Sequence, residues 1–389
     1  MSTAAARRAY RGPALFSFGF RPFFLFGAAW SALVVPIWLA SFLHGGEFTR
    51  DWHVHEMIFG FLGAVMAGFL TTAIPNWTGR MPVVGAPLGG LVGLWIAGRV
   101  AMLYAPLLGP VSAVIDSAFL VAFAAVVWRE VLAGRNWRNL PVCGLTTLFA
   151  IANIAFHLRE ALGLEDLGVR LALGAAAVLL SLIGGRITPS FTRNWLRARK
   201  IAAEPAAASR FDLGVVVLTA VGAAAWTFAP TAPLSGAILA CAGGANLIRL
   251  GRWKGWKAAA EPLVWILHVG YAWLGIALLA LGGSVLDPLR APRTAGIHAL
   301  TAGAIGVMTL AVMTRASRGH TGRMLTADRA TTAIYLAVNA AALLRVAAPF
   351  AGAAQTWLLC ASGLAWSLAF GGFALVYARM LLTPKPQAA

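Results

Sequence analysis

Residues 262–283, PLVWILHVGYAWLGIALLALGG, contain no Asp, Glu, Lys or Arg. A helix needs about 20 mainly apolar residues to cross the hydrocarbon core of a bilayer, so this stretch predicts a transmembrane helix. Comparable windows recur along the chain and predict about twelve spans in all. They lie near 23–43, 56–75, 86–107, 111–131, 140–162, 168–188, 212–230, 233–250, 262–283, 295–314, 330–349 and 355–381. The predicted fold is an all-α polytopic membrane protein, with residues 1–389 as one transmembrane domain.

Composition supports this fold class. The chain is 60% hydrophobic and 11% charged, whereas soluble domains carry about 25% charged residues. Its formal charge of +18 comes from 31 Lys and Arg residues that lie in short gaps between apolar runs, without basic tracts. This pattern is typical of membrane topology signals and excludes a nucleic-acid partner. The three cysteines are far apart and lack the spacing of iron–sulfur or covalent haem sites.

The distribution of positive residues predicts the orientation. Lys and Arg accumulate on the cytoplasmic side of membrane proteins. With twelve spans, the two termini, the gaps after even-numbered spans and the helix ends that border them hold 24 of the 31 Lys and Arg residues. A multi-pass protein with cytoplasmic N- and C-termini is therefore predicted.

The sequence also repeats itself at an offset of 243 residues. Residues 27–81 match residues 270–324, so spans 1 and 2 resemble spans 9 and 10 in the same orientation. The matched pairs include Trp30 with Trp273, His55 with His298, and the run Thr78-Gly79-Arg80-Met81 with Thr321-Gly322-Arg323-Met324. A weaker match at an offset of 129 involves span 6. Together they predict three pseudo-symmetric four-helix units, with spans 2, 6 and 10 in equivalent places.

Polar side chains inside a bilayer are costly and mark function. In the predicted topology, a polar layer lies near the outer ends of the helices. It contains His44, His53, His55, His157, His298, Glu56, Arg99, Asp116, Arg159, Glu160 and Arg345. Because the repeat pairs His55 with His298, we predict a bis-histidine haem b between spans 2 and 10. The alternative is that these histidines only form hydrogen bonds between helices and that the neighbouring glycines, Gly60, Gly63, Gly303 and Gly306, are packing seams.

Other residues are candidates for the same chemistry. Arg99 and Arg345 would pair with haem propionates. His268 and His320, on the predicted cytoplasmic side, would hold a second haem or a copper ion; the alternative is a core histidine and a loop histidine. His53 and His55 are two residues apart, so on a regular helix they point about 200° apart and do not readily serve one metal. The alternative is that the chain is still extended at Trp52, in which case both histidines face one side.

Several strings in the chain resemble the NnrS family. They are Phe20-Arg21-Pro22-Phe23-Phe24, Trp52-His53-Val54-His55-Glu56-Met57-Ile58-Phe59-Gly60-Phe61, Gly68-Phe69-Leu70, Asn76-Trp77-Thr78-Gly79-Arg80, Thr188-Pro189-Ser190-Phe191-Thr192-Arg193-Asn194, His268-Val269-Gly270-Tyr271-Ala272-Trp273 and Gly319-His320-Thr321-Gly322-Arg323. The resemblance spans nearly the whole chain. It implies a bacterial inner-membrane protein with haem and copper in the response to nitric oxide and nitrosative stress.

The three-unit arrangement is also similar to the catalytic subunit of haem–copper oxidases, in which spans 2 and 10 carry the ligands of the low-spin haem. The chain departs from that pattern because span 6 has no histidine, so the usual three-histidine metal site is not visible. For a metal, the candidate ligands are His44, His53, His55, His157 and His298. No catalytic residue is assigned.

Three classes of function remain open. The leading one is a haem-b protein that acts in nitric oxide tolerance by binding or turning over NO, as a membrane oxidoreductase, or by passing electrons from a quinol or another donor. The alternative is a transporter for an anion or a small nitrogen species without redox chemistry, using buried arginines such as Arg99, Arg345, Arg186 and Arg249. The third is a haem-free structural partner of a respiratory complex.

Overall fold

The computed structural model describes residues 10–385, and over this range the chain is helical, without strands. Twelve helices are long and apolar enough to cross a membrane, which confirms the predicted number. They are Phe20–His44 (α2), Arg50–Thr78 (α3, η2 and α4), Ala86–Leu103 (α5), Pro110–Ala133 (α7), Trp137–His157 (η3 and α8), Leu167–Ala198 (α9, η4 and α10), Arg210–Phe228 (α11), Pro233–Gly251 (α12), Pro262–Leu286 (α13), Arg293–His320 (α14, η6 and α15), Arg329–Phe350 (α16 and η7) and Gly352–Leu382 (η8 and α17). The predicted cytoplasmic termini include residues 1–9 and 386–389, which lie outside the described residues.

The sixth helix differs most from its predicted bounds. It was expected to end near residue 188 but continues to Ala198 as α10 (Gly185–Ala198). The part of the helix beyond residue 188 carries Arg193 and Arg197. Charged residues end an apolar window, whereas arginine is a good helix former. The buried positions of α10, such as Thr192 and Leu196, are four residues apart and share one face. The end of an amphipathic helix is therefore not visible to a search for apolar runs.

Three helices contain a π-helical segment. These segments are η2 (Glu56–Leu62), η4 (Leu180–Gly184) and η6 (Ala299–Ile305), in the second, sixth and tenth spans. A π-helical turn shifts the side chains that follow it around the helix and is frequent at functional sites. The first and last of these segments are 243 residues apart, the offset of the sequence repeat. The three-unit symmetry and the likeness to haem–copper oxidases stay predictions.

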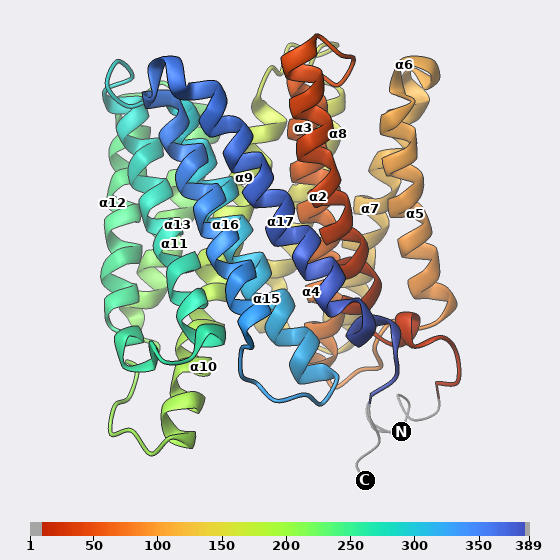
Figure 1. The fold of residues 1–389 in the computed structure, drawn as a ribbon, viewed down its shortest axis with the longest axis vertical. Helices are drawn as coiled ribbons and strands as arrows, with labels where there is room; N and C mark the ends of the chain where they lie inside the picture. The colour runs from red at the N-terminus through yellow and green to blue at the C-terminus, as the bar shows by residue number, and fades with distance from the viewer. Residues whose placement is uncertain (1–9, 386–389) are drawn as a thin grey trace. The chain divides into compact units, whose positions relative to one another are not determined.

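The chain forms two compact units. Unit 1 consists of Met1–Ala172, Ala316–Met324 and Phe370–Ala389, and unit 2 consists of Leu173–Arg315 and Leu325–Ala369. Within unit 1, the start of α2 and the end of α17 lie at the same end, whereas α3 (Arg50–His55) lies at the opposite end (Figure 1). The start of α2 is fixed on α4 (Gly63–Thr78), because the backbone N–H of Phe20 donates to the Thr72 hydroxyl at 3.0 Å.

Unit 2 is built on a close pair of helices, α12 and α13. A methyl group added to Gly243 of α12 would lie 2.7 Å from the carbonyl oxygen of Gly275 on α13. One added to Gly282 would lie 2.6 Å from the carbonyl oxygen of Gly236. Both distances are shorter than a van der Waals contact, so only glycine lets the two backbones approach this closely. This use of small residues replaces the hydrophobic effect, which is weak between helices in lipid.

Candidate functional site

The most strongly polar buried site of unit 1 begins at the start of the second span. Thr49 caps α3, and its hydroxyl accepts from the backbone N–H of Trp52 at 3.3 Å. His55 is the last residue of α3, and Glu56 is the first residue of η2. Both side chains are completely buried. A buried charge needs partners, and each of these residues has them.

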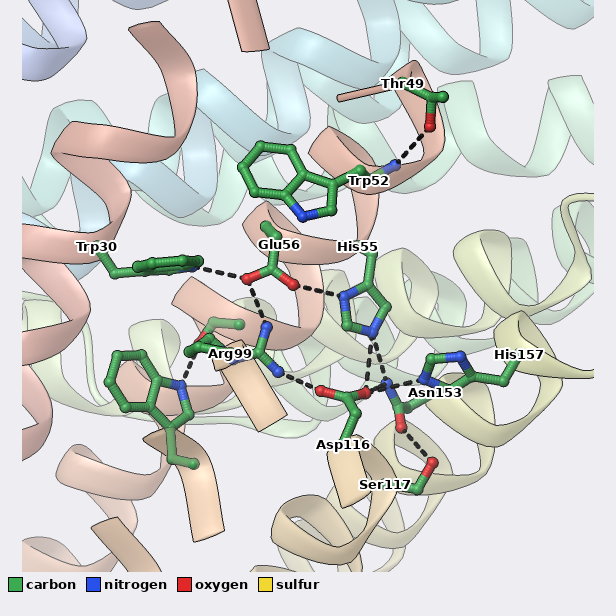
Figure 2. A network of polar contacts seen from close by, with 12 residues as sticks. Trp30, Thr49, Trp52, His55, Glu56, Arg99, Asp116, Ser117, Asn153 and His157 are labelled. Atoms are coloured by element: carbon green, nitrogen blue, oxygen red, sulfur yellow. Dashed lines mark hydrogen bonds and ion pairs between the residues drawn. The ribbon is translucent and has the colours of Figure 1, made fainter. Parts of the chain in front are cut away.

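His55 uses both of its ring nitrogens. Its Nδ1 lies 2.9 Å from Oε1 of Glu56, and its Nε2 lies 2.9 Å from Oδ2 of Asp116 on α7. Figure 2 shows the imidazole between these two carboxylates. Both carboxylates are also paired with Arg99 and act as acceptors, so a ring nitrogen of His55 that carries a proton donates it to the carboxylate that it faces.

Arg99 on α5 joins the two carboxylates from the other side. Its Nη1 donates to Oε2 of Glu56 at 2.6 Å, and its Nη2 forms an ion pair with Oδ1 of Asp116. Glycine makes room for this pair, because a methyl group at Gly60 would lie 2.5 Å from Nη1 of Arg99. Trp30 completes the shell around Glu56 by donating its indole N–H to Oε2 at 2.7 Å.

Helix α8 supplies two further side chains, one turn apart. Asn153 donates from Nδ2 to Oδ2 of Asp116 at 2.9 Å, and Nε2 of His157 lies 2.9 Å from the same oxygen. The amide oxygen of Asn153 accepts from the hydroxyl of Ser117 at 2.9 Å, which orients the amide (Figure 2). Oδ2 of Asp116 is therefore the point on which three side chains converge.

Three of these residues have the composition of a metal site. The ligand atoms of His55, Asp116 and His157 all lie within 4.8 Å of one another. The three residues come from three helices of unit 1, and two of them are buried. Imidazole nitrogen together with carboxylate oxygen suits zinc, copper and iron.

A comparison with family models gives a match over nearly the whole chain. The model described as NnrS protein matches residues 14–385. The chain belongs to the NnrS family. A comparison with curated proteins finds no match. Membership of the NnrS family and the twelve apolar helices agree with the expectation of a multi-pass membrane protein in the nitric oxide response.

The other histidines predicted for unit 1 of this NnrS-family chain lie outside the cluster. His53 stacks on Trp38, with ring centroids 4.3 Å apart, and faces a different side of α3 from His55. His44 is exposed at the end of α2. His320 lies at the end of α15, where its ring is 5.5 Å from that of Phe20.

The remaining predicted residues belong to unit 2. His298 ends α14 (Arg293–His298), and its Nδ1 contacts the carbonyl oxygen of Thr294 at 2.7 Å. Nε2 of His268 on α13 contacts the hydroxyl of Thr192 at 2.8 Å. Arg345 lies near the end of α16 and is partly buried. Haem ligation by His298, His268 and His320, and propionate binding by Arg345, stay predictions.

The glycines that were expected to leave room for a macrocycle are covered by protein side chains. In unit 1, Leu120 would lie 3.3 Å from a methyl group at Gly63. In unit 2, Trp273 and Trp366 would each lie 2.6 Å from methyl groups at Gly303 and Gly306, respectively. These contacts agree with the alternative hypothesis that the glycines allow close packing of protein side chains.

The described residues therefore fit a metal ion better than a haem iron at His55. A haem iron needs a ring nitrogen, and both nitrogens of His55 already contact carboxylates. A metal ion between His55, Asp116 and His157 would bind ligand atoms that already lie close together. The bis-histidine haem requires one of these carboxylates to move away.

Sequence reasoning did not foresee the role of Asp116 or Asn153. Asp116 was visible as a carboxylate within an apolar span, but nothing in the sequence pairs it with His55. Asn153 and His157 are four residues apart and share one face of α8, which is the signal that was available. Trp30 was noticed only as part of the repeat, although its indole N–H needs a partner in the core.

Proposed function

We propose that this chain is a membrane metalloprotein of the nitric oxide response, with its metal ion held by His55, Asp116 and His157. The observation that carries the proposal is the convergence of three ligand atoms within 4.8 Å in the polar interior of unit 1. Zinc-type bonds of about 2.0–2.1 Å in a tetrahedron place ligand atoms roughly 3.3 Å apart. The contacts of 2.9 Å from each Nε2 to Oδ2 therefore need to lengthen by only a few tenths of an ångström.

The charges of the cluster also favour a cation. Glu56 and Asp116 bring two negative charges, and Arg99 brings one positive charge. The remaining negative charge is buried, where it needs a proton on an imidazole or a bound cation. Nδ1 of His55 faces Glu56, and its Nε2 faces Asp116. A bound cation would replace the proton between this nitrogen and the carboxylate.

The surrounding residues have separate tasks. Glu56 orients His55, and partners of this kind fix ligand geometry in metal sites. Arg99 occupies the second oxygen of Asp116 and leaves Oδ2 to face the histidines. Asn153 holds that oxygen in place. Copper or iron bound here would supply a redox-active position at which nitric oxide binds.

A transporter of anions is supported less well. Of the arginines proposed for such a path, Arg99 is already neutralised by two carboxylates. In unit 2, Nε of Arg249 forms a 2.9 Å ion pair with Asp212, and its Nη1 donates to the hydroxyl of Tyr271. Arginines that are paired in this way have little remaining attraction for an anion.

The test is the metal and haem content of the purified protein and three variants. Metal is measured by mass spectrometry, and haem by a pyridine haemochrome assay with reduced-minus-oxidised spectra before and after NO is added. We expect His157→Ala to lose the metal and the NO-dependent signal, and His298→Ala to keep both. His44→Ala is the matched control, because His44 is exposed and outside the cluster.

Two outcomes decide against this assignment. A b-type haem signal that disappears in His298→Ala but persists in His157→Ala would support the bis-histidine haem instead. A folded wild-type protein with neither metal nor haem would contradict the proposal, and transport of an anion would become the leading function.

A further inference from the structure

A second unusual site of unit 1 is formed by Arg21, near the start of α2, and Arg323, in the segment Ala316–Met324. The start of α2 lies at the same end of the unit as the end of α17 (Figure 1). Arginines at the edge of a membrane are usually topology signals, and their head groups reach into water. Arg21 does not follow this pattern, because only 3% of its surface is exposed. Its burial needs another explanation.

Arg21 is only partly satisfied by the protein. Its Nη1 donates to the carbonyl oxygens of Leu381 at 2.8 Å and Thr383 at 2.7 Å, at the end of α17. These carbonyls form the negative end of a helix dipole, so the contact is favourable. Its Nε, however, is buried and has no hydrogen-bond partner among residues 10–385.

Arg323 also has a buried donor, its Nη1, without a hydrogen-bond partner in the described part of the chain. The rings of Phe20 and His320, 5.5 Å apart, hold the turn that carries Arg323 against the start of α2, and in the described part no carboxylate pairs with either arginine. Two like charges with unused donors thus share one end of unit 1.

The repeat supplies an internal comparison for Arg323. Its counterpart in the other Thr-Gly-Arg run is Arg80. Nε of Arg80 forms a 2.8 Å ion pair with Glu130. The same sequence context therefore carries a neutralised arginine in one copy and an arginine with an unused donor in the other. Because the paired arrangement of Arg80 is compatible with the same turn, the fold does not require an unused donor at Arg323.

The neighbours add positive charge and aromatic surface. A methyl group at Gly322 would lie 2.3 Å from Cε and 3.1 Å from Nζ of Lys385, so this ammonium group is close to the Thr-Gly-Arg turn. The ring of His320 lies 5.7 Å from Phe18 and 5.5 Å from Phe20. Cationic groups beside apolar rings are suited to an anion at a membrane interface.

We propose that Arg21 and Arg323 bind a phosphate-type oxyanion, carried either by the headgroup of an anionic phospholipid or by a free ion. The planar fork of a guanidinium group matches the geometry of such oxygens. The anion would accept from the unused Nε of Arg21 and Nη1 of Arg323 and would separate their charges. This site uses none of the residues of the metal cluster, so either proposal can fail without the other.

The test uses the full-length protein and three variants. Binding of inorganic phosphate is measured by titration calorimetry in detergent, and thermal unfolding is measured in nanodiscs of phosphatidylcholine with or without phosphatidylglycerol. We expect Arg323→Gln to weaken the binding at least tenfold or to abolish the stabilisation by phosphatidylglycerol. Arg80→Gln is the matched control and should match the wild type, since Glu130 keeps a 2.7 Å pair with Arg129.

The outcomes separate the two sources of the anion. Stabilisation by phosphatidylglycerol without binding of inorganic phosphate supports a lipid headgroup, and binding of inorganic phosphate supports a free ion. Arg21→Lys keeps the charge but loses the fork, so it should also weaken binding. If this buried variant does not fold, Arg323→Gln carries the test, because Arg323 is only partly buried. No binding of either probe, or equal losses in Arg323→Gln and Arg80→Gln, overturns the proposal.

Discussion

The buried arginine of the cluster allows the most direct test of the electrostatic reasoning. Arg99 is 3% exposed and is paired with Glu56 and Asp116, which are 0% and 1% exposed. Replacing it by methionine keeps an unbranched side chain but leaves two buried carboxylates without their cation. Removing one partner of a buried ion pair costs about 3–5 kcal/mol. We therefore expect Arg99→Met to lower the melting temperature by roughly 5–10 °C.

The assay is thermal unfolding of the detergent-purified protein, followed by circular dichroism. Arg290→Met is the matched control, because Arg290 is 90% exposed and its 3.7 Å contact with Asp287 is a surface pair. Surface pairs contribute about 0–1 kcal/mol, so the control should melt close to the wild type.

A second variant isolates the charge from the packing. In Arg99→Met with Glu56→Gln, one of the two uncompensated charges is also removed. We expect this double variant to be more stable than the sum of the two single changes by about 1–3 kcal/mol. Strict additivity, or a melting temperature of Arg99→Met that matches the Arg290→Met control, would refute the claim that Arg99 neutralises the carboxylates.

Two further predictions concern packing and pH. Gly243→Ala should destabilise unit 2 by about 1–3 kcal/mol, because its methyl group would meet backbone atoms of α13; Gly244→Ala, which faces open space, should be neutral or slightly stabilising in the same melting experiment. In the loop between α10 and α11, hydrogen bonding from Arg197 holds the pKa of the Glu204 carboxyl below its ordinary value. The stabilisation from this pair should be present at neutral pH and lost as the pH falls through the lowered pKa. A carbon-13 titration of Glu204 should show its pKa rising in Arg197→Gln, and an unchanged pKa would contradict this cause.

The sequence by itself determined the helices. Each span must satisfy its own backbone and present apolar side chains to lipid, so its signal is local and can be read from a window of about 20 residues. A hydropathy window misplaces a helix end where the helix no longer faces lipid. Helix α10 is an example, because it continues to Ala198 beyond the apolar run. The sequence also indicated that His55, Glu56, Arg99, Asp116 and His157 belong to one polar layer.

Tertiary structure decided which of these residues meet. His55 and Asp116 are 61 residues apart, and Asp116 and His157 are 41 residues apart. Whether such side chains converge depends on how each helix is rotated about its axis and on how closely the helices approach. Neither quantity is encoded within a single span. In unit 1, for example, the side chain of Arg99 lies where a methyl group at Gly60 would be, 2.5 Å from its Nη1, and no pattern within either span shows this.

The internal repeat also separates what the sequence determined from what the tertiary structure decided. It identified His55 and His298 as equivalent in sequence, and this equivalence predicted a shared haem. The structure surrounds His55 with Asp116 and Glu56, whereas Nδ1 of His298 contacts the carbonyl oxygen of Thr294 on its own helix. The two positions differ in chemistry for two reasons: Asp116 comes from a part of the chain outside the repeat, and Glu56 is matched in the second copy by Ala299, which cannot accept a hydrogen bond from a side chain.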